Sequence, residues 1–74
     1  MSDALTTVQA LLARVKGMDA DRLPPETDIQ SLQLDSLDIL EVVMGIEETF
    51  DVELDPTRFA DCRTLADIVR AIEA

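Results

Sequence analysis

The stretch LQLDSLDILEVVMGIEETF, residues 32–50, decides the fold of this chain. Its apolar residues recur every three or four positions, which is the period of an amphipathic α-helix. Asp35 stands just before the periodic run and Asp38 follows three residues later, a spacing typical of a helix N-cap with a reciprocal capping box. The stretch therefore predicts a helix over residues 36–50 that begins at Ser36.

This helix has apolar residues on two sides when it is wound at about 100° per residue. One side is an ordinary core face, formed by Ile39, Val42, Val43, Ile46 and Phe50. Leu37 and Met44 fall near the opposite side. Leu40 lies at the border, in the direction of Ser36. Since a helix needs only one buried side, the second set is incidentally exposed, covered by a loop, or a binding surface.

Helical spacing also predicts a helix at each end of the chain. Ser2 and Asp3 can cap a first helix that runs to about Lys16. Thr64, with Asp67 three residues later, resembles a capping box and begins the last helix. The expected apolar faces are Leu5, Val8, Leu11, Leu12 and Val15 in the first helix, and Leu65, Ile68, Val69 and Ile72 in the last.

A long connection, from about Met18 to Leu34, separates the first two helices. Two adjacent prolines within it prevent helix and favour extended chain. Asp55 followed by Pro56 predicts a short helix to about Ala60. The fold class is therefore all-α: a small bundle of three principal helices plus one short helix, with a long loop between the first and second. Apolar residues expected to hold that loop against the core are Leu23, Ile29, Leu32 and Leu34.

Length and composition indicate one small domain over residues 1–74. Almost half of the residues are apolar, which is enough for one core. No apolar run approaches the roughly 18 residues of a membrane span, and the N-terminus lacks the features of a secretory signal, so we expect no membrane insertion. Cys62 is the only cysteine, which excludes an internal disulfide and fits a reducing compartment. We expect a free-standing monomer in the cytoplasm.

The formal net charge is −10, from 16 acidic and 6 basic residues. Such a surface repels phosphate backbones, which argues against nucleic acid as a partner. Basic proteins are the expected partners, attracted by long-range electrostatic steering that salt weakens. The same charge is equally compatible with a simple role in keeping a small domain in solution.

Catalysis and metal binding find little support in the residues. A nucleophilic serine needs a neighbouring base, but the chain has no His, and nothing places its only lysine, Lys16, near Ser36. The acids from Asp51 onward resemble the start of a calcium loop, yet Pro56 and Cys62 occupy the positions that require glycine and glutamate. The sequence therefore predicts no catalytic residue and no metal site, and the protein is not expected to be an enzyme.

Capping accounts for Asp35 and Asp38 but leaves Ser36 unexplained. As the first helical residue, Ser36 is expected to be exposed at the positive end of the helix. Free backbone N–H groups at that end favour a phosphate, so a phosphodiester attached to the serine hydroxyl would be well placed. Ser36 is therefore interpreted as an attachment point.

The segment LDSLDILEVVMGIEETFDVEL resembles the prosthetic-group site and second helix of acyl carrier proteins. The match to the D-S-L motif of that family is direct at Asp35, Ser36 and Leu37, and the order of helices is similar over the whole chain. The resemblance implies that Ser36 bears 4′-phosphopantetheine, added from coenzyme A by a phosphopantetheinyl transferase. It also implies that the arm holds acyl or aminoacyl intermediates as thioesters, while partner enzymes do the chemistry.

The resemblance further implies a partner-binding surface around the motif. A loading ligase and synthases or transferases with basic docking patches would contact it, through exposed pairs weak enough to release the carrier. The predicted partner-binding residues are Asp38, Leu40, Glu41, Met44, Glu47, Glu48 and Arg58. The alternative is an unmodified acidic helical adaptor that docks to basic partner proteins without an arm.

Two departures from the family pattern leave the cargo open. Many members have glycine two residues before the aspartate, where this chain has Gln33, followed by Leu34. Arg58 and Arg63 occupy a region that tends to be acidic in fatty-acid carriers. Arg58 with Phe59 is more similar to carriers of polyketide, nonribosomal peptide, D-alanyl or other aminoacyl pathways.

Overall fold

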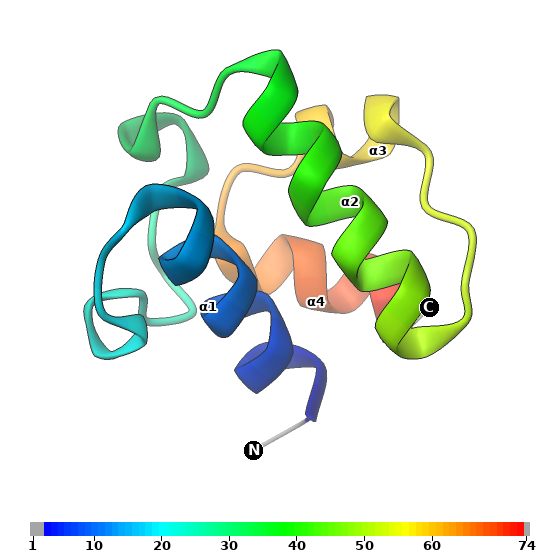
Figure 1. The fold of residues 1–74 in the computed structure, drawn as a ribbon, viewed down its shortest axis with the longest axis horizontal. Coiled ribbons are helices and arrows are strands. Elements are labelled where there is room, and N and C mark those ends of the chain that lie inside the picture. The colour runs from blue at the N-terminus through cyan, green and yellow to red at the C-terminus, as the bar shows by residue number, and fades with distance from the viewer. Residues whose placement is uncertain (1–2, 74) are drawn as a thin grey trace.

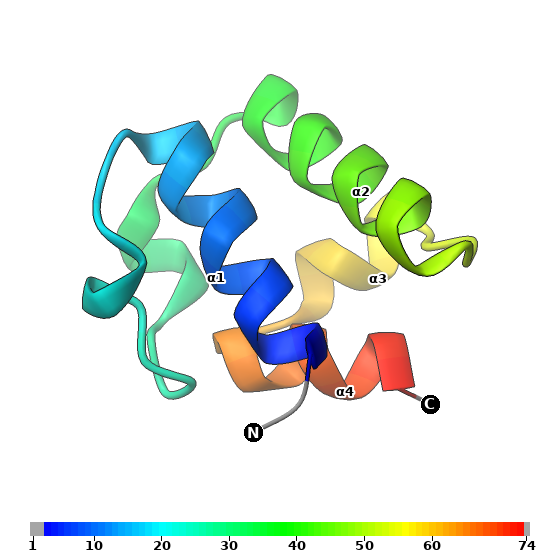
Figure 2. The same cartoon turned by 60° about the horizontal axis from the view of Figure 1, so that its bottom comes forward.

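The computed structural model describes residues 3–73, which form four α-helices and two short 3₁₀ helices (Figure 1). In chain order these are α1 (Asp3–Lys16), η1 (Ala20–Arg22), η2 (Ile29–Leu32), α2 (Ser36–Phe50), α3 (Pro56–Asp61) and α4 (Leu65–Glu73). α1 packs against both α2 and α4, and α3 packs against α2. Figure 2 shows α1 and α2 side by side, with α4 beneath them. The all-α prediction is confirmed, and the predicted cap at Ser2 lies outside the described residues.

The core is one cluster of apolar side chains to which all four α-helices contribute. The largest fully buried side chains are Phe59, Leu12, Leu23, Ile46, Leu65, Ile68, Val8, Val42 and Val43. Within residues 3–73 no polar or charged residue is buried, so the hydrophobic effect is the main stabilising contribution. None of the described helices is long and apolar enough to cross a membrane.

Two glycines shape α1 and its contact with α2. Gly17 has a φ of +66° and ends α1, while the amide of Met18 donates to the carbonyl of Ala13 at 2.9 Å, as in a Schellman C-cap. Gly45 lies where the two helices meet, and a Cβ added there would come within 2.6 Å of Leu11 Cδ2. The absence of a side chain at Gly45 therefore allows Leu11 to pack directly on the backbone of α2.

The long connection between α1 and α2 is more ordered than the sequence suggested, because it contains η1 and η2. Leu23 and Ile29 are buried, and Leu32 and Leu34 pack against the core, so the predicted anchors are confirmed. The side-chain amide of Gln9 in α1 donates to the carbonyl of Leu23 at 2.8 Å. The prolines exclude a regular helix here but permit short 3₁₀ turns on either side of them.

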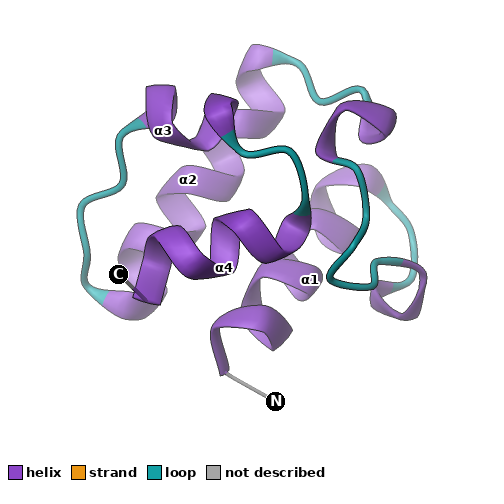
Figure 3. Ribbon diagram, turned by 180° about the vertical axis from the view of Figure 1, so that it is seen from behind, coloured by secondary structure: helices purple, strands orange, loops and turns teal. Residues whose placement is uncertain are grey.

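The same connection is hydrogen-bonded to the start of α4. Figure 3 shows α4 crossing the molecule in the view from behind. The amides of Leu65 and Ala66 donate to the carbonyls of Thr27 and Pro25, at 3.0 and 2.8 Å. These bonds satisfy two backbone amides that a helix start otherwise leaves without partners. Ile29 adds a third bond, from its amide to the carbonyl of Arg63 at 2.9 Å.

The predicted capping box of α4 is confirmed. Asp67 Oδ2 accepts from the amide of Thr64 at 3.2 Å and from the amide of Arg63 at 3.0 Å, while Thr64 Oγ1 accepts from the amide of Asp67 at 3.3 Å. Asp67 also forms an ion pair with Arg70. The bonds from the Arg63 and Thr64 amides, followed by Arg70, lower the pKa of the Asp67 carboxyl below its ordinary value.

Candidate functional site

The start of α2 is fixed by a capping box, as predicted. Asp35 has an extended backbone and its Oδ1 accepts from the amide of Asp38 at 2.8 Å. In return, Asp38 Oδ2 accepts from the amide of Asp35 at 3.4 Å. This reciprocal pair stabilises the helix start, and Ser36 is the first residue of α2.

Ser36 is exposed at the N-terminal end of α2. Within residues 3–73 its hydroxyl makes no hydrogen bond, and the amides of Ser36 and Leu37 have no acceptor. The positive end of the helix dipole points the same way. An accessible hydroxyl beside two unpaired amides fits a phosphodiester, whose charge those groups would stabilise.

A shallow depression of about 440 Å³ lies next to Ser36, between α2 and α3. Its other lining residues are Ile39, Leu40, Pro56, Thr57 and Ala60. None of these lining side chains is an acid or a base. In residues 3–73 no group of three or more metal-ligating side chains comes together.

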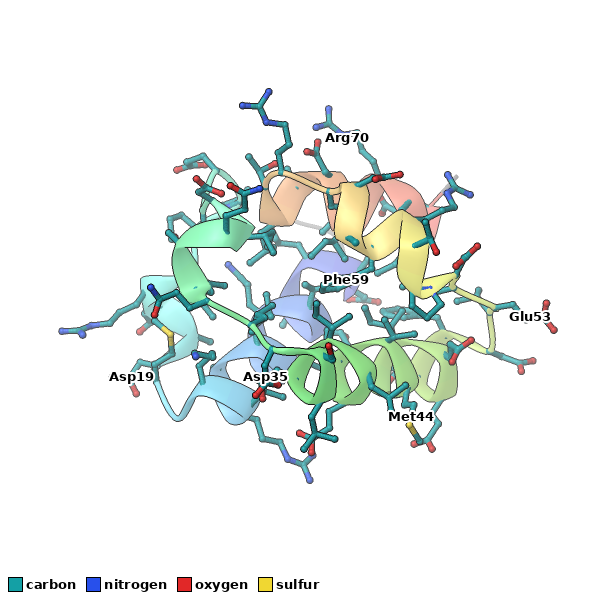
Figure 4. All side chains as sticks on the ribbon, turned by 90° about the horizontal axis from the view of Figure 1, so that it is seen from above. Asp19, Asp35, Met44, Glu53, Phe59 and Arg70 are labelled. Carbon is teal, nitrogen blue, oxygen red and sulfur yellow. The ribbon has the colours of Figure 1, made fainter. Side chains whose placement is uncertain are left out.

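The α3 wall of this depression was not predicted from the sequence. The proline at position 56 indicated where α3 begins, but no local pattern shows that α3 lies beside the start of α2. That placement comes from Phe59, which is buried and directed into the interior of the molecule (Figure 4). Anchoring Phe59 in the core leaves Thr57 and Ala60 exposed at the edge of the depression.

The second set of apolar residues on α2 is exposed. Leu37 is 63% exposed, Leu40 47% and Met44 49%. Figure 4 shows Met44 directed away from the body of the molecule. The loop before α2 therefore does not cover these side chains, and one of the three interpretations offered by the sequence is wrong.

The predicted partner-binding acids are not equivalent in the structure. Glu41 and Glu48 are exposed, whereas Asp38 is half-buried and engaged in the capping box. Glu47 is half-buried, and its Oε2 accepts from the amide of Leu54 at 3.1 Å. Glu47 thus has a structural role that the sequence did not reveal, since it ties the segment after α2 back to the helix.

Two residues of the C-terminal part, Arg58 and Cys62, lie one turn apart in sequence. Arg58 is exposed on α3, so its predicted contact with partners is sterically open. The Cys62 thiol donates to the carbonyl of Arg58 at 3.4 Å. Burial raises the pKa of the Cys62 thiol, with the Asp67 carboxylate adding to the shift and the Arg58 guanidinium opposing it. A thiol held in its neutral form is a poor nucleophile.

Comparison with known proteins identifies the family. Residues 6–72 match the phosphopantetheine attachment site family. The chain is 36% identical over 73 residues to the acyl carrier protein of Helicobacter hepaticus, covering 97% of this chain and 96% of that protein. It is 32% identical to that of Trieres chinensis over 73 residues, covering 97% and 91%, and 36% identical to that of Lactococcus lactis over 66 residues, covering 89% and 88%. The chain belongs to the acyl carrier protein family.

Membership of this family shows where the reactive group of such a protein comes from. Acyl carrier proteins are carriers rather than enzymes, and they hold a covalently attached 4′-phosphopantetheine group. Carriers of this kind are served by a phosphopantetheinyl transferase and exchange cargo with synthases and transferases. In such carriers the reactive group is the thiol of the arm, so the protein itself needs no nucleophile.

Proposed function

We propose that this chain is a discrete carrier protein and that Ser36 is the residue to which 4′-phosphopantetheine is attached. The single observation that supports this most strongly is the exposed Ser36 hydroxyl beside the unpaired amides of Ser36 and Leu37. The bound arm would supply a terminal thiol that carries acyl or aminoacyl cargo as a thioester. We further propose that residues 1–74 act as one domain, as a monomer and in the cytoplasm, where the free thiol of Cys62 would stay reduced.

The residues around Ser36 would divide the work of holding and presenting the arm. The Asp35–Asp38 capping box keeps the first turn of α2 in place, so Ser36 stays at the helix start. The free amides and the helix dipole would offset the negative charge of the phosphodiester, an interaction typically worth about 0.3–1 kcal/mol at an exposed helix end. Leu37 is exposed and would contact the transferase next to the hydroxyl that receives the arm.

Partner enzymes of fatty-acid, polyketide, nonribosomal peptide or related biosynthesis would dock along α2 and α3. Exposed Leu40 and Met44 would give the contact an apolar centre, and the flanking acids would attract a basic patch. The proposed contact residues are Asp38, Leu40, Glu41, Met44, Glu47, Glu48 and Arg58. Exposed charge pairs of this kind release readily, which suits a carrier that must leave after each transfer.

Intact-protein mass spectrometry tests the attachment site. The protein is incubated with coenzyme A and a phosphopantetheinyl transferase, and we expect a mass gain of one arm in the parent. Ser36→Ala should show no gain. Ser31→Ala is the matched control, because Ser31 is another exposed serine near the start of α2 and should leave the gain intact.

A mass gain that persists in Ser36→Ala would contradict the assignment of the site. A parent protein that stays unmodified with several transferases, and carries no arm when isolated from its native host, would instead favour the unmodified adaptor. In that case, binding to basic partner proteins should survive Ser36→Ala unchanged.

A further inference from the structure

A second depression lies between α1 and α2, with a volume of about 460 Å³. It shares no lining residue with the depression beside Ser36. Its apolar lining residues are Leu11 and Val15 of α1 and Met44 and Gly45 of α2, with Met44 at the exposed rim. Leu11 lies close to the backbone of α2 here, because Gly45 has no side chain. We call this feature the α1–α2 groove.

The two walls of the α1–α2 groove carry opposite charges. Glu41 and Glu48 line the α2 side, two helical turns apart, and Arg14 lines the α1 side. All three side chains are exposed. In the part of the chain that the structure describes, none of them is in an ion pair. The groove therefore presents one negative and one positive edge, neither of which is neutralised by this chain.

We propose that the α1–α2 groove binds an amphipathic helix of a partner protein, so that α1 is part of the docking surface of this carrier. The occupant would place an apolar stripe, with residues at i, i+3 or i+4, and i+7, over Met44 and Leu11. One flank of that helix would carry Lys or Arg toward Glu41 and Glu48, and the other flank an Asp or Glu toward Arg14. This deepens the proposed function, on which it rests, by stating the chemistry of one partner.

The charge pattern selects the orientation of the bound helix. A helix with basic residues on both flanks would be attracted by Glu41 and Glu48 on the α2 wall but repelled by Arg14 on the α1 wall. Reversing a helix with one basic and one acidic flank would bring like charges together on both walls. Charge complementarity of this kind contributes more to specificity and orientation than to affinity, so a weak but directional contact is expected.

A helix in the groove would leave the attachment site free. Met44 is eight residues after Ser36, which is about 12 Å along the axis of α2. The depression beside Ser36 is built from α2 and α3 instead of α1 and α2. The groove would therefore hold the carrier on a partner while Ser36, and anything attached to it, stays accessible.

Two synthetic helical peptides of about four turns test the proposal. Both have the same leucine stripe. The first has lysines on one flank and glutamates on the other, and the second has lysines on both flanks. Each is titrated into ¹⁵N-labelled protein and into the variant Arg14→Glu, and amide chemical shifts give both the site and the dissociation constant. Arg14 is exposed and outside any described ion pair, so the variant should fold normally.

We expect the shift changes of the first peptide to lie along residues 11–15 and 41–48. Arg14→Glu should weaken binding of the first peptide and strengthen binding of the second, changing the ratio of their dissociation constants by about threefold or more. Lys16→Glu is the control, because it makes the same charge change in α1 outside the groove, and it should leave that ratio unchanged. An unchanged ratio in Arg14→Glu, or shift changes confined to α2 and α3, would overturn the proposal.

A second readout separates this inference from the function on which it rests. With the first peptide bound, the phosphopantetheinyl transferase should still add one arm to the protein. If the peptide-free protein gains no arm, the proposed function fails while the groove result stands. If the arm is added without peptide and blocked with it, the claim that the groove leaves Ser36 accessible is wrong.

Discussion

Gln33 has a φ of +53°, in the left-handed region that favours glycine. It is the C-cap of η2, and its amide donates to the carbonyl of Gln30 at 3.1 Å, so the reversed backbone turns the chain toward Asp35. This explains why many members of the family have glycine at this position. Gln33 adopts this conformation at an energetic cost that glycine would not incur.

Replacing Gln33 with glycine should therefore stabilise the protein. A left-handed residue with a side chain costs roughly 1–2 kcal/mol, and the extra freedom of glycine in the unfolded chain costs roughly 0.5–1 kcal/mol. We expect Gln33→Gly to raise the free energy of unfolding by about 0.5–1 kcal/mol in urea denaturation. Gln30→Gly is the control, because Gln30 has no positive φ, and it should destabilise. If Gln33→Gly lowers the free energy of unfolding instead, the stabilising contacts of the Gln33 side chain outweigh the backbone strain.

At the scale of elements, α4 is a short helix whose first turn is held by several hydrogen bonds. It spans Leu65–Glu73, and a helix this short is not stable alone in water. Its start is held by Thr64, by Asp67 and by the carbonyls of the connection between α1 and α2. The first turn of α4 is therefore the point at which a helix and a distant loop stabilise each other.

Removing the Asp67 carboxylate should destabilise the fold in a pH-dependent way. Folding lowers the pKa of the Asp67 carboxyl, so the ionised carboxylate stabilises the folded state. This stabilisation is complete above the ordinary aspartate pKa and is lost as the pH falls through the lower pKa of the folded state. We expect Asp67→Ala to lower the melting temperature at pH 7, and the difference from the parent to shrink below about pH 4. Asp61→Ala, at the exposed C-terminal end of α3, is the control and should not lower it. If the difference in melting temperature between Asp67→Ala and the parent stays constant with pH, the negative charge of Asp67 does not stabilise the fold.

For the whole molecule, the net charge of −10 opposes a compact fold. The radius of gyration is 10.8 Å, so every acid lies within reach of the others at low ionic strength. In residues 3–73, Arg70–Asp67 is the one ion pair, which leaves most acids without a compensating partner. Self-repulsion should therefore lower stability in dilute buffer.

Salt should raise the melting temperature. The Debye length falls from about 30 Å at 0.01 M to about 3 Å at 1 M, from longer than the radius of gyration to shorter. We expect a rise of about 5 °C over this range in differential scanning calorimetry. Asp19 and Glu53 are exposed, and replacing both with lysine changes the net charge from −10 to −6. That variant should respond less to salt, and a parent whose melting temperature ignores salt would refute the explanation.

Local sequence patterns predicted most of the elements, because helix starts and faces depend on residues close together in the chain. The capping boxes at Asp35 and Thr64 are short-range features, and both are confirmed. The core face of α2 is confirmed at Val42, Val43 and Ile46, whereas Ile39 and Phe50 are only partly buried. The D-S-L motif likewise indicated the family from adjacent residues. In the sequence, Gln33 could be recognised only as a departure from the glycine of the family pattern. Its positive φ could not be predicted, because a glutamine residue can adopt several backbone conformations.

Tertiary structure alone decided how these elements combine into a site. The sequence by itself determined that Ser36 begins an exposed helix end, in a chain that has no histidine. Only the folded chain brought α3 beside that helix end, turned Glu47 toward Leu54 and set Arg14 across from Glu41 and Glu48. The physical reason is that capping and periodicity act within a few residues, whereas the packing of one helix on another depends on which side chains fill the shared core.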